Sequence, residues 1–172
     1  MSFPDERFPD VTALHRGVDA AAAQVEAALP APLTCRRGCA GCCVDDLTVF
    51  EVEAAVIRAL YPDVLRQAAG PVGRCAFLDA DDSCRIYAAR PYVCRTQGLA
   101  LRWFEEDEDS GDILDRRDIC PLNDAVLDIT GATDEQLWLL GPYEEQLYDL
   151  QEGASGSPDR VALRSLFVGD GE

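Results

Sequence analysis

The sequence contains no lysine, one histidine, one methionine and no long apolar run. No stretch approaches 18 uninterrupted apolar residues, so we predict no membrane-spanning helix. The single histidine, His15, follows Leu14 in an expected helix, where we predict a surface or half-buried position rather than a metal ligand. One such histidine does not predict a serine–histidine–aspartate nucleophile system. Residues 1–7 contain no basic stretch that leads into an apolar run, so no secretory signal is expected.

The charge balance is strongly acidic. The chain carries 32 aspartates and glutamates against 15 basic residues, all of them arginine, which gives a formal net charge of −17. A field of this sign repels phosphate backbones, so binding to nucleic acid is not expected. We interpret the acidity first as a source of solubility and second as a surface that attracts metal ions or a particular partner.

With 172 residues, the chain is long enough for one domain with its own hydrophobic core. Cysteines are therefore not needed to brace a small fold. We expect a cytoplasmic protein, in which thiols stay reduced and eight cysteines indicate metal or redox chemistry. In a secreted protein the same residues would form a disulfide scaffold, which remains an alternative.

Apolar periodicity predicts a mostly α-helical chain with a small β-hairpin, in which irregular cysteine-rich loops pack on amphipathic helices. Thr48 and Glu51 match a capping box that would begin the second helix. Helices are expected over residues 11–29, 49–60, 62–69, 123–129, 134–140 and 142–150, and strands over residues 99–104 and 113–119. Residues 1–152 are expected to form a single cysteine-cluster domain, and residues 153–172 a flexible linker and short amphipathic tail.

The cysteines are the most informative residues of the chain. They are Cys35, Cys39, Cys42, Cys43, Cys75, Cys84, Cys94 and Cys120. The first three form a C-x3-C-x2-C pattern in a loop that Gly38 and Gly41 allow to fold tightly, and neighbouring Arg36 and Arg37 are expected to lower the thiol pKa values. Cys43 directly follows Cys42, so it serves a second metal, a second position of a cluster, or no metal at all. All-thiolate ligand sets select Zn²⁺ or iron–sulfur centres.

The cysteine run, followed by Cys75-Ala76-Phe77-Leu78-Asp79, Cys84-Arg85-Ile86-Tyr87, Arg90-Pro91-Tyr92-Val93-Cys94-Arg95 and Cys120, closely resembles the YkgJ-type cysteine-cluster family. The resemblance covers about residues 33–121. It implies a zinc- or iron-chelating domain in which all eight cysteines are candidate ligands and Arg90 and Arg95 support them. One branch of that family is similar to flagellin lysine methylases, which carry an iron–sulfur cluster.

Two functions follow from these observations. The first is a metal-binding protein that holds Zn²⁺ or an Fe–S cluster such as [4Fe-4S], with iron favoured because the three-cysteine loop is compact and rich in glycine. The alternative is a small Fe–S-dependent enzyme resembling the methylase branch, although the sequence marks no catalytic constellation beyond the cysteines. The expected partner is a metal ion or cluster, with no membrane and no nucleic acid.

Overall fold

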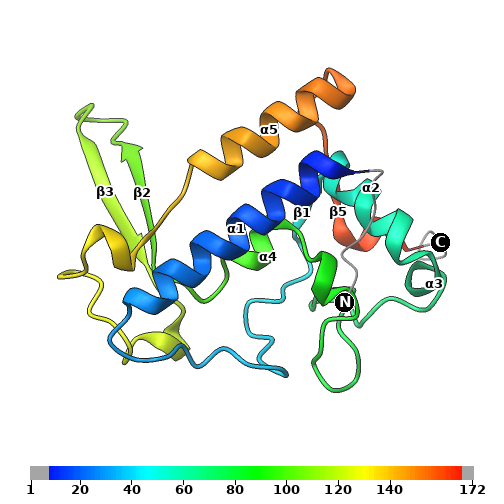
Figure 1. Ribbon diagram of the computed structural model, residues 1–172, viewed down its shortest axis with the longest axis horizontal. Helices are drawn as coiled ribbons and strands as arrows, with labels where there is room; N and C mark the ends of the chain where they lie inside the picture. Colours follow the sequence, from blue (N-terminus) through cyan, green and yellow to red (C-terminus); the bar gives the residue numbers. More distant parts are fainter. Residues whose placement is uncertain (1–7, 168–172) are drawn as a thin grey trace.

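The computed structural model describes residues 8–167, which form helices, short 3-10 helices (η) and small sheets (Figure 1). The α-helices are α1 (Pro9–Ala28), α2 (Glu51–Leu60), α3 (Pro62–Leu65), α4 (Tyr92–Arg95) and α5 (Pro142–Ser155). The 3-10 helices are η1 (Tyr87–Ala89), η2 (Pro121–Asn123), η3 (Asp134–Gln136) and η4 (Leu163–Leu166). The strands are β1 (Thr48–Phe50), β2 (Leu101–Glu106), β3 (Ile113–Asp118), β4 (Trp138–Leu139) and β5 (Arg160–Ala162).

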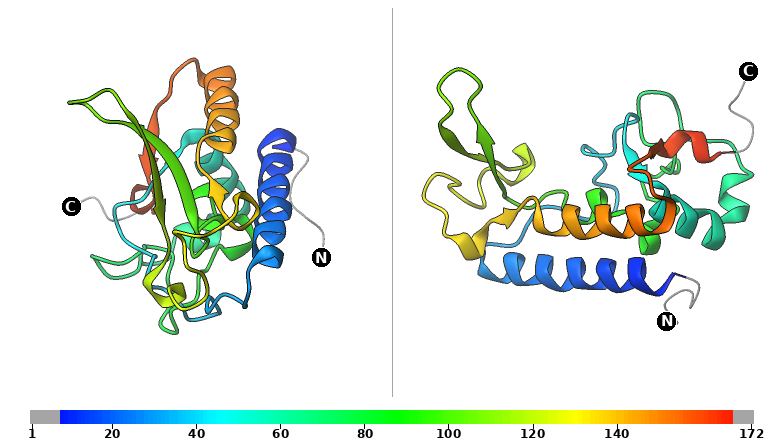
Figure 2. Two further views of the ribbon diagram at one scale, coloured as in Figure 1. Left: turned by 90° about the vertical axis from the view of Figure 1, so that its left-hand side faces the viewer. Right: turned by 90° about the horizontal axis from the view of Figure 1, so that it is seen from above.

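The helix α1 lies beside α5 and runs in the opposite direction along the length of the molecule (Figures 1 and 2). Its apolar residues recur every three or four positions, so Leu14 and Val18 face one core cluster. Leu147 of α5 and Trp138 of β4 complete that cluster. The first and last predicted helices are therefore confirmed, with α5 extending to Ser155.

The predicted capping box at Thr48 is wrong. Residues 48–50 form β1, which pairs antiparallel with β5, and α2 begins at Glu51 without a side-chain cap. The Thr48 hydroxyl instead accepts a hydrogen bond from Arg160 Nε (3.1 Å). A distant strand partner at the C-terminal end outweighs the local capping signal, because a β-branched pair such as Thr48–Val49 is well suited to a strand.

The predicted hairpin is confirmed as β2 and β3, which project from one end of the molecule (Figure 1). A third strand, β4, pairs parallel with β2 and was not predicted. Two predicted helices are wrong: residues 123–129 fold as turns after η2, and residues 134–140 divide into η3 and β4. The fold is therefore mixed α and β rather than mostly α.

The segment after α5 packs against the core. Leu163, Leu166 and Phe167 are buried with Phe77 and Ile57, beneath the cysteine-bearing chain. Locally, the structure thus places strand β5 and helix η4 where a flexible linker and tail were expected. The division into a domain of residues 1–152 and a tail remains a prediction.

In the view of Figure 1, the cysteine-bearing loops lie below α1 and α5 lies above it. They comprise residues 29–47, residues 66–91 and the turn that precedes η2. They contain little regular structure, as the lack of periodicity predicts. The first loop runs from α1 to β1, and the second runs from α3 to α4. The positions of these elements limit which thiols can lie close together.

Candidate metal centre

All eight cysteines are free thiols. Seven of them line one cavity of about 1160 Å³: Cys35, Cys39, Cys42, Cys43, Cys75, Cys84 and Cys94. The eighth, Cys120, is close enough to Cys35 to influence the pKa of its thiol. Sulfur atoms from three separate stretches of backbone therefore gather on one side of the molecule, and no disulfide joins them. The disulfide-scaffold alternative finds no support.

The first cysteine loop is built from two tight turns. Cys39 N–H donates to the Arg36 carbonyl (2.9 Å), and Cys43 N–H donates to the Ala40 carbonyl (3.1 Å). Gly38 occupies a positive φ of 83°, which a side chain would strain, as expected for a loop that bends around its own thiols. These turns bring Cys39 and Cys42 to the cavity wall.

Asn123 connects the first loop to the turn that carries Cys120. Its fully buried side chain accepts from Thr34 N–H (2.8 Å) and donates through Nδ2 to the Cys35 sulfur (3.6 Å) and to the Gly98 carbonyl (2.9 Å). Its own N–H donates to the Cys120 carbonyl (2.7 Å). One amide thus fixes Cys35 relative to Cys120, although no spacing in the sequence indicated this role.

A second connection joins Cys43 to Cys75. Cys75 N–H donates to the Cys43 carbonyl (2.9 Å), and the chain then folds back through a bridge between Leu78 and Cys84. Cys75 belongs to the hydrophobic cluster that contains Phe77, and the partly buried Cys43 and Cys84 pack against that cluster. Apolar packing therefore helps to hold this group of thiols together.

Arg164 of η4 braces the same region. Its guanidinium donates to Asp45 Oδ1 (2.6 Å), to the Gly70 carbonyl (2.8 Å) and to the Pro71 (3.0 Å) and Arg74 (2.9 Å) carbonyls. The hydrogen bond from Arg164 holds the pKa of Asp45 below its ordinary value. A residue near the C-terminal end thereby ties the loop after Cys43 to the loop before Cys75.

The thiols differ in how readily they ionise. Burial raises the pKa of Cys75 and of Cys84, and it raises that of Cys94 to about 12. Burial also raises the pKa of Cys35, and the hydrogen bond from Asn123 only partly opposes it. The expected lowering by the neighbouring arginines is therefore wrong for Cys35, because loss of solvation is the largest influence on the pKa of its thiol.

Cys42 and Cys43 form a coupled pair. A hydrogen bond from the Cys43 thiol lowers the pKa of Cys42 to about 6, and the same bond raises that of Cys43. The lower pKa favours the thiolate of Cys42, which is the form that binds metals. The hydrogen bond with Cys43 is thus the main reason that Cys42 ionises readily.

Arg90 and Arg95 line the thiol cavity, but their polar contacts lead toward α1. Arg95 donates to Asp19 Oδ2 (2.6 Å) and to His15 Nδ1 (3.3 Å), and Arg90 lies 3.6 Å from Asp19 Oδ1. The Arg90 guanidinium also stacks over the ring of Tyr87, 4.2 Å from its centroid. The structure shows that both arginines form ion pairs with Asp19. That they support the cysteines remains a prediction.

The surface or half-buried position predicted for His15 is wrong. The residue is 5% exposed, and its Nε2 lies 2.8 Å from Glu53 Oε1, which also accepts from Tyr92 N–H (2.7 Å). Because a guanidinium can only donate, Nδ1 accepts from Arg95 and Nε2 carries the proton given to Glu53. The signal was present in the sequence, since Val11, His15 and Val18 share one helical face.

The donor set suits a thiophilic metal, since seven free thiols line one cavity and carboxylates are fewer there than thiols. Within residues 8–167, however, no three His, Cys, Asp or Glu side chains lie close enough together to hold a metal ion as they stand. Binding therefore requires the loops or side chains to close around the ion. Such closure couples metal binding to local folding.

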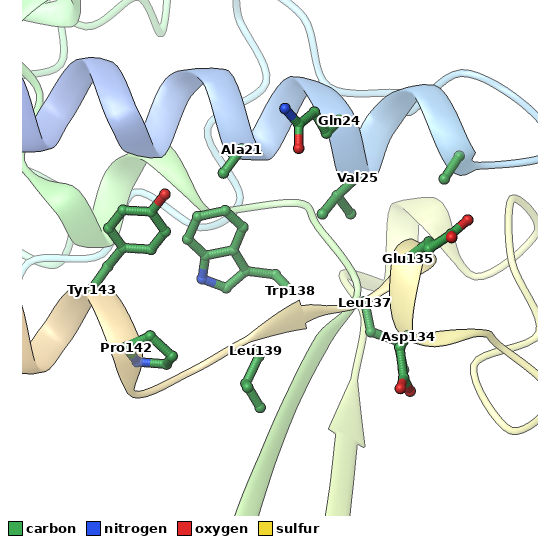
Figure 3. Close-up of a pocket in the computed structure, with 11 residues that line it drawn as sticks. Ala21, Gln24, Val25, Asp134, Glu135, Leu137, Trp138, Leu139, Pro142 and Tyr143 are labelled. Atoms are coloured by element: carbon green, nitrogen blue, oxygen red, sulfur yellow. The ribbon is translucent and has the colours of Figure 1, made fainter.

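A second cavity, of about 530 Å³, lies between α1, β4 and the start of α5 (Figure 3). Trp138 and Tyr143 stack in it, with centroids 5.3 Å apart, and Asp134 and Glu135 lie at its other end. It contains no cysteine and no cationic side chain. Nothing in its composition matches the thiol chemistry of the first cavity.

None of the helices within residues 8–167 is long and apolar enough to cross a membrane. Neither the curated proteins nor the solved structures contain a significant match to the chain. A family model does match, over residues 34–121, and that family is described as "Putative zinc- or iron-chelating domain". The match spans all eight cysteines and about half of the chain, so this protein belongs to the CxxCxxCC family of zinc- or iron-chelating domains.

Proposed function

We propose that this protein holds iron, as an iron–sulfur cluster, or zinc through its eight cysteine thiolates. The observation that carries the proposal is the convergence of free thiols from three separate segments on one side of α1. Metal binding in general agrees with the family to which the chain belongs. Expected cytoplasmic conditions would keep these thiols reduced and available.

The roles of the residues follow from their contacts. Cys42, whose thiol ionises most readily, would engage a metal first, and the buried thiols would follow as the loops close. Asn123 holds Cys35 in place by a hydrogen bond to its sulfur, and Arg164 holds the loops around Cys75. A zinc ion would supply structural cross-linking, whereas an iron–sulfur cluster would add electron transfer.

Iron is the favoured metal. The first loop is compact, and its Gly38 and Gly41 have no side chain that could cover backbone N–H groups beside the cysteines. Exposed N–H groups next to sulfur ligands are typical surroundings of iron–sulfur centres, in which they tune the potential. Zinc in an all-thiolate site needs no such donors to sulfide.

Metal analysis of anaerobically purified protein tests the proposal. Brown protein with broad absorbance near roughly 400 nm would support an iron–sulfur cluster, and colourless protein with about two equivalents of zinc would support zinc. Cys42→Ser should lose metal, whereas Ser83→Ala, a change without a thiol in the same cavity, should retain it. Protein that binds neither metal in any preparation, with all thiols titratable, would refute the proposal.

One observation favours a second candidate, a small Fe–S-dependent enzyme resembling the flagellin lysine methylases. The thiol cavity, at about 1160 Å³, is larger than a metal centre needs and has enough room for a small molecule. Partly exposed Tyr87 and Arg90 border it and could contact a substrate. Saturable binding of S-adenosylmethionine to the cluster-loaded protein, measured by calorimetry, would support this function, and absence of binding would exclude it.

A further inference from the structure

We propose that the thiol cavity also holds a subsite for a small organic phosphate, formed by Arg36, Arg37, Arg90 and Tyr87. All four residues line this cavity. The guanidiniums bind the phosphate group through charge-assisted hydrogen bonds, and the ring of Tyr87 stacks on a planar part of the same molecule. The inference goes beyond metal binding, because none of these four side chains is a candidate metal ligand.

Most arginines of this acidic chain are already paired with carboxylates. Ion pairs of 3.0 Å or less are formed by Arg58, Arg66, Arg74, Arg95, Arg102, Arg116, Arg117 and Arg164. By contrast, Arg36 and Arg37 form no ion pair within residues 8–167, and the Arg90 ion pair with Asp19 is long, at 3.6 Å. The cavity therefore contains three guanidiniums whose charge is poorly compensated, in a chain with 32 acidic residues.

The same three arginines keep most of their hydrogen-bond donors unused. Arg37 Nε donates to Ser83 Oγ (2.9 Å), and Arg36 donates only a long bond to the Thr34 carbonyl (3.5 Å). The guanidinium of Arg90, although its side chain is only 20% exposed, donates no hydrogen bond to any residue between 8 and 167. Because a guanidinium has five N–H donors, a ligand in the cavity finds several of them available.

The carboxylates that line the cavity do not compensate these arginines. They are Glu26, Asp79 and Asp82. Asp82 is paired with Arg74 (2.7 Å), and Asp79 Oδ1 accepts two backbone N–H groups of its own turn (2.9 and 2.8 Å). The three arginines thus outnumber the carboxylates left without a cationic partner. The net charge of −17 repels anions at long range, but salt screens this field over about 8 Å, so the nearby guanidiniums decide binding inside the cavity.

The cysteines do not use these donors directly. Within the described residues 8–167, no arginine donates a hydrogen bond to a cysteine sulfur, whereas Asn123 Nδ2 does so to Cys35 (3.6 Å). The N–H groups of Arg36, Arg37 and Arg90 are therefore available to an anion other than a thiolate.

Three guanidiniums in one cavity favour a phosphate over a carboxylate as that anion. A phosphate monoester has three terminal oxygens and about two negative charges near neutral pH, so it can accept hydrogen bonds from several guanidiniums at once. A carboxylate has only two oxygens and one negative charge, which a single guanidinium satisfies.

Tyr87 adds an aromatic surface to the subsite. It is 63% exposed and belongs to no hydrophobic cluster formed by residues 8–167. The Arg90 guanidinium lies over its ring, 4.2 Å from the centroid, so the cation and the ring form one platform. An exposed ring that takes no part in the core is suited to stacking on a planar group of a ligand.

Calorimetric titration with phenyl phosphate, a planar ring joined to a phosphate, tests the subsite. The full-length protein is used as purified under anaerobic conditions, with the metal it holds. We expect saturable binding, with weaker binding of inorganic phosphate, which lacks the ring, and of benzoate, which lacks the phosphate. No saturable binding of phenyl phosphate, or tighter binding of benzoate, would overturn the proposal.

Variants of single residues locate the binding. Arg37→Gln and Arg90→Gln should each weaken phenyl phosphate binding about tenfold or more, because charge-assisted hydrogen bonds are lost. Arg16→Gln makes the same charge change at an exposed position of α1 outside the cavity and should leave the affinity unchanged. Tyr87→Ala should weaken binding of phenyl phosphate but not of inorganic phosphate. Equal effects of Arg16→Gln and Arg37→Gln would show unspecific attraction and refute the subsite.

Metal content is measured in every variant, so that the two proposals fail separately. If Arg37→Gln and Arg90→Gln lose metal but bind phenyl phosphate as the unmodified chain does, the arginines serve the thiolates and the subsite is refuted. If Arg90→Gln does not fold, the exposed Arg37 decides the question. A chain that never holds zinc or iron refutes the proposed function, whereas the phosphate subsite still stands or falls by the titration.

Discussion

At the residue scale, Gly98 shows how closely the backbone approaches a proposed ligand. Gly98 is buried at a positive φ of 91°, and a methyl group at its Cα would overlap the sulfur of Cys35. Gly73 has nearly the same φ, 87°, but open space around it. Alanine substitutions at the two glycines can therefore distinguish the cost of backbone strain, which both share, from the cost of a clash with the sulfur, which only Gly98 has.

Gly98→Ala should destabilise the protein by about 1–2 kcal/mol from its φ and by a further 1–3 kcal/mol, roughly, from the clash with Cys35. It should also weaken metal binding, whereas Gly73→Ala should show only the smaller effect. Urea denaturation and metal content measure the two consequences. Equal losses in the two variants would mean that Gly98 serves the backbone alone.

The buried pair of His15 and Glu53 is a second feature at this scale. Glu53 is 3% exposed and accepts both the His15 ring proton and the Tyr92 N–H that begins α4. A carboxylate so deeply buried is stabilised only by its hydrogen-bond partners.

Glu53→Gln should therefore lower the free energy of unfolding by about 2 kcal/mol, because the buried hydrogen bonds from His15 and Tyr92 then end on a neutral amide oxygen instead of a charged carboxylate. Glu51→Gln on the same helix removes only an exposed ion pair with Arg58 and should have a much smaller effect. Denaturant unfolding of both variants is the measurement. A Glu53→Gln effect no larger than that of Glu51→Gln would contradict the assigned role.

At the scale of elements, η4 acts as a brace for the cysteine loops. The arginine at its second position, Arg164, bonds three backbone carbonyls before Cys75 and the carboxylate of Asp45 after Cys43. These loops have few other constraints, because they contain little regular structure.

Arg164→Gln should destabilise the protein by about 2 kcal/mol or more, since hydrogen bonds from a charged donor are lost. It should also speed proteolysis within residues 66–75 and release of metal from Cys75. Arg66→Gln, which removes an exposed ion pair with Asp63, is the control and should behave as the unmodified chain does. Unchanged proteolysis in Arg164→Gln would exclude a bracing role.

At the scale of the whole molecule, the thiols link stability to pH in opposite directions with and without metal. Burial raises the pKa of Cys94 from an ordinary value of 9.0 to about 12, and it also raises those of Cys75 and Cys84. A raised folded-state pKa means that the unfolded chain loses its proton first as pH increases. The stability this provides is complete below pH 9.0 and is lost as pH rises toward 12.

The metal-free protein should therefore become less stable between about pH 9 and pH 12, as measured by urea midpoints, and Cys94→Ala should reduce this loss. The metal-loaded protein should lack the loss, because its ligands are already deprotonated. It should instead release metal as pH falls and protons compete for the thiolates. Identical pH profiles with and without metal would show that these cysteines are not ligands.

Periodicity alone predicted the helices and strands that are determined by their own local sequence pattern. The apolar stripe of α1 and the alternating segments of the β2–β3 hairpin are local patterns, and both are confirmed. Strands β1, β4 and β5 were missed because short segments become strands only when a distant partner is present. His15 was misplaced although its helical face was readable, since its buried partners Glu53 and Arg95 come from elsewhere in the chain.

The sequence by itself determined the family and the chemistry of the candidate centre, because sulfur is the donor that eight cysteines provide whatever their arrangement. Only the tertiary structure decided which thiols are neighbours. That grouping depends on Asn123, Arg164 and the packing around Phe77, contacts between residues far apart in the chain. Spacing along a chain limits how far apart two loop residues can be, but long-range contacts select which of the permitted neighbours meet.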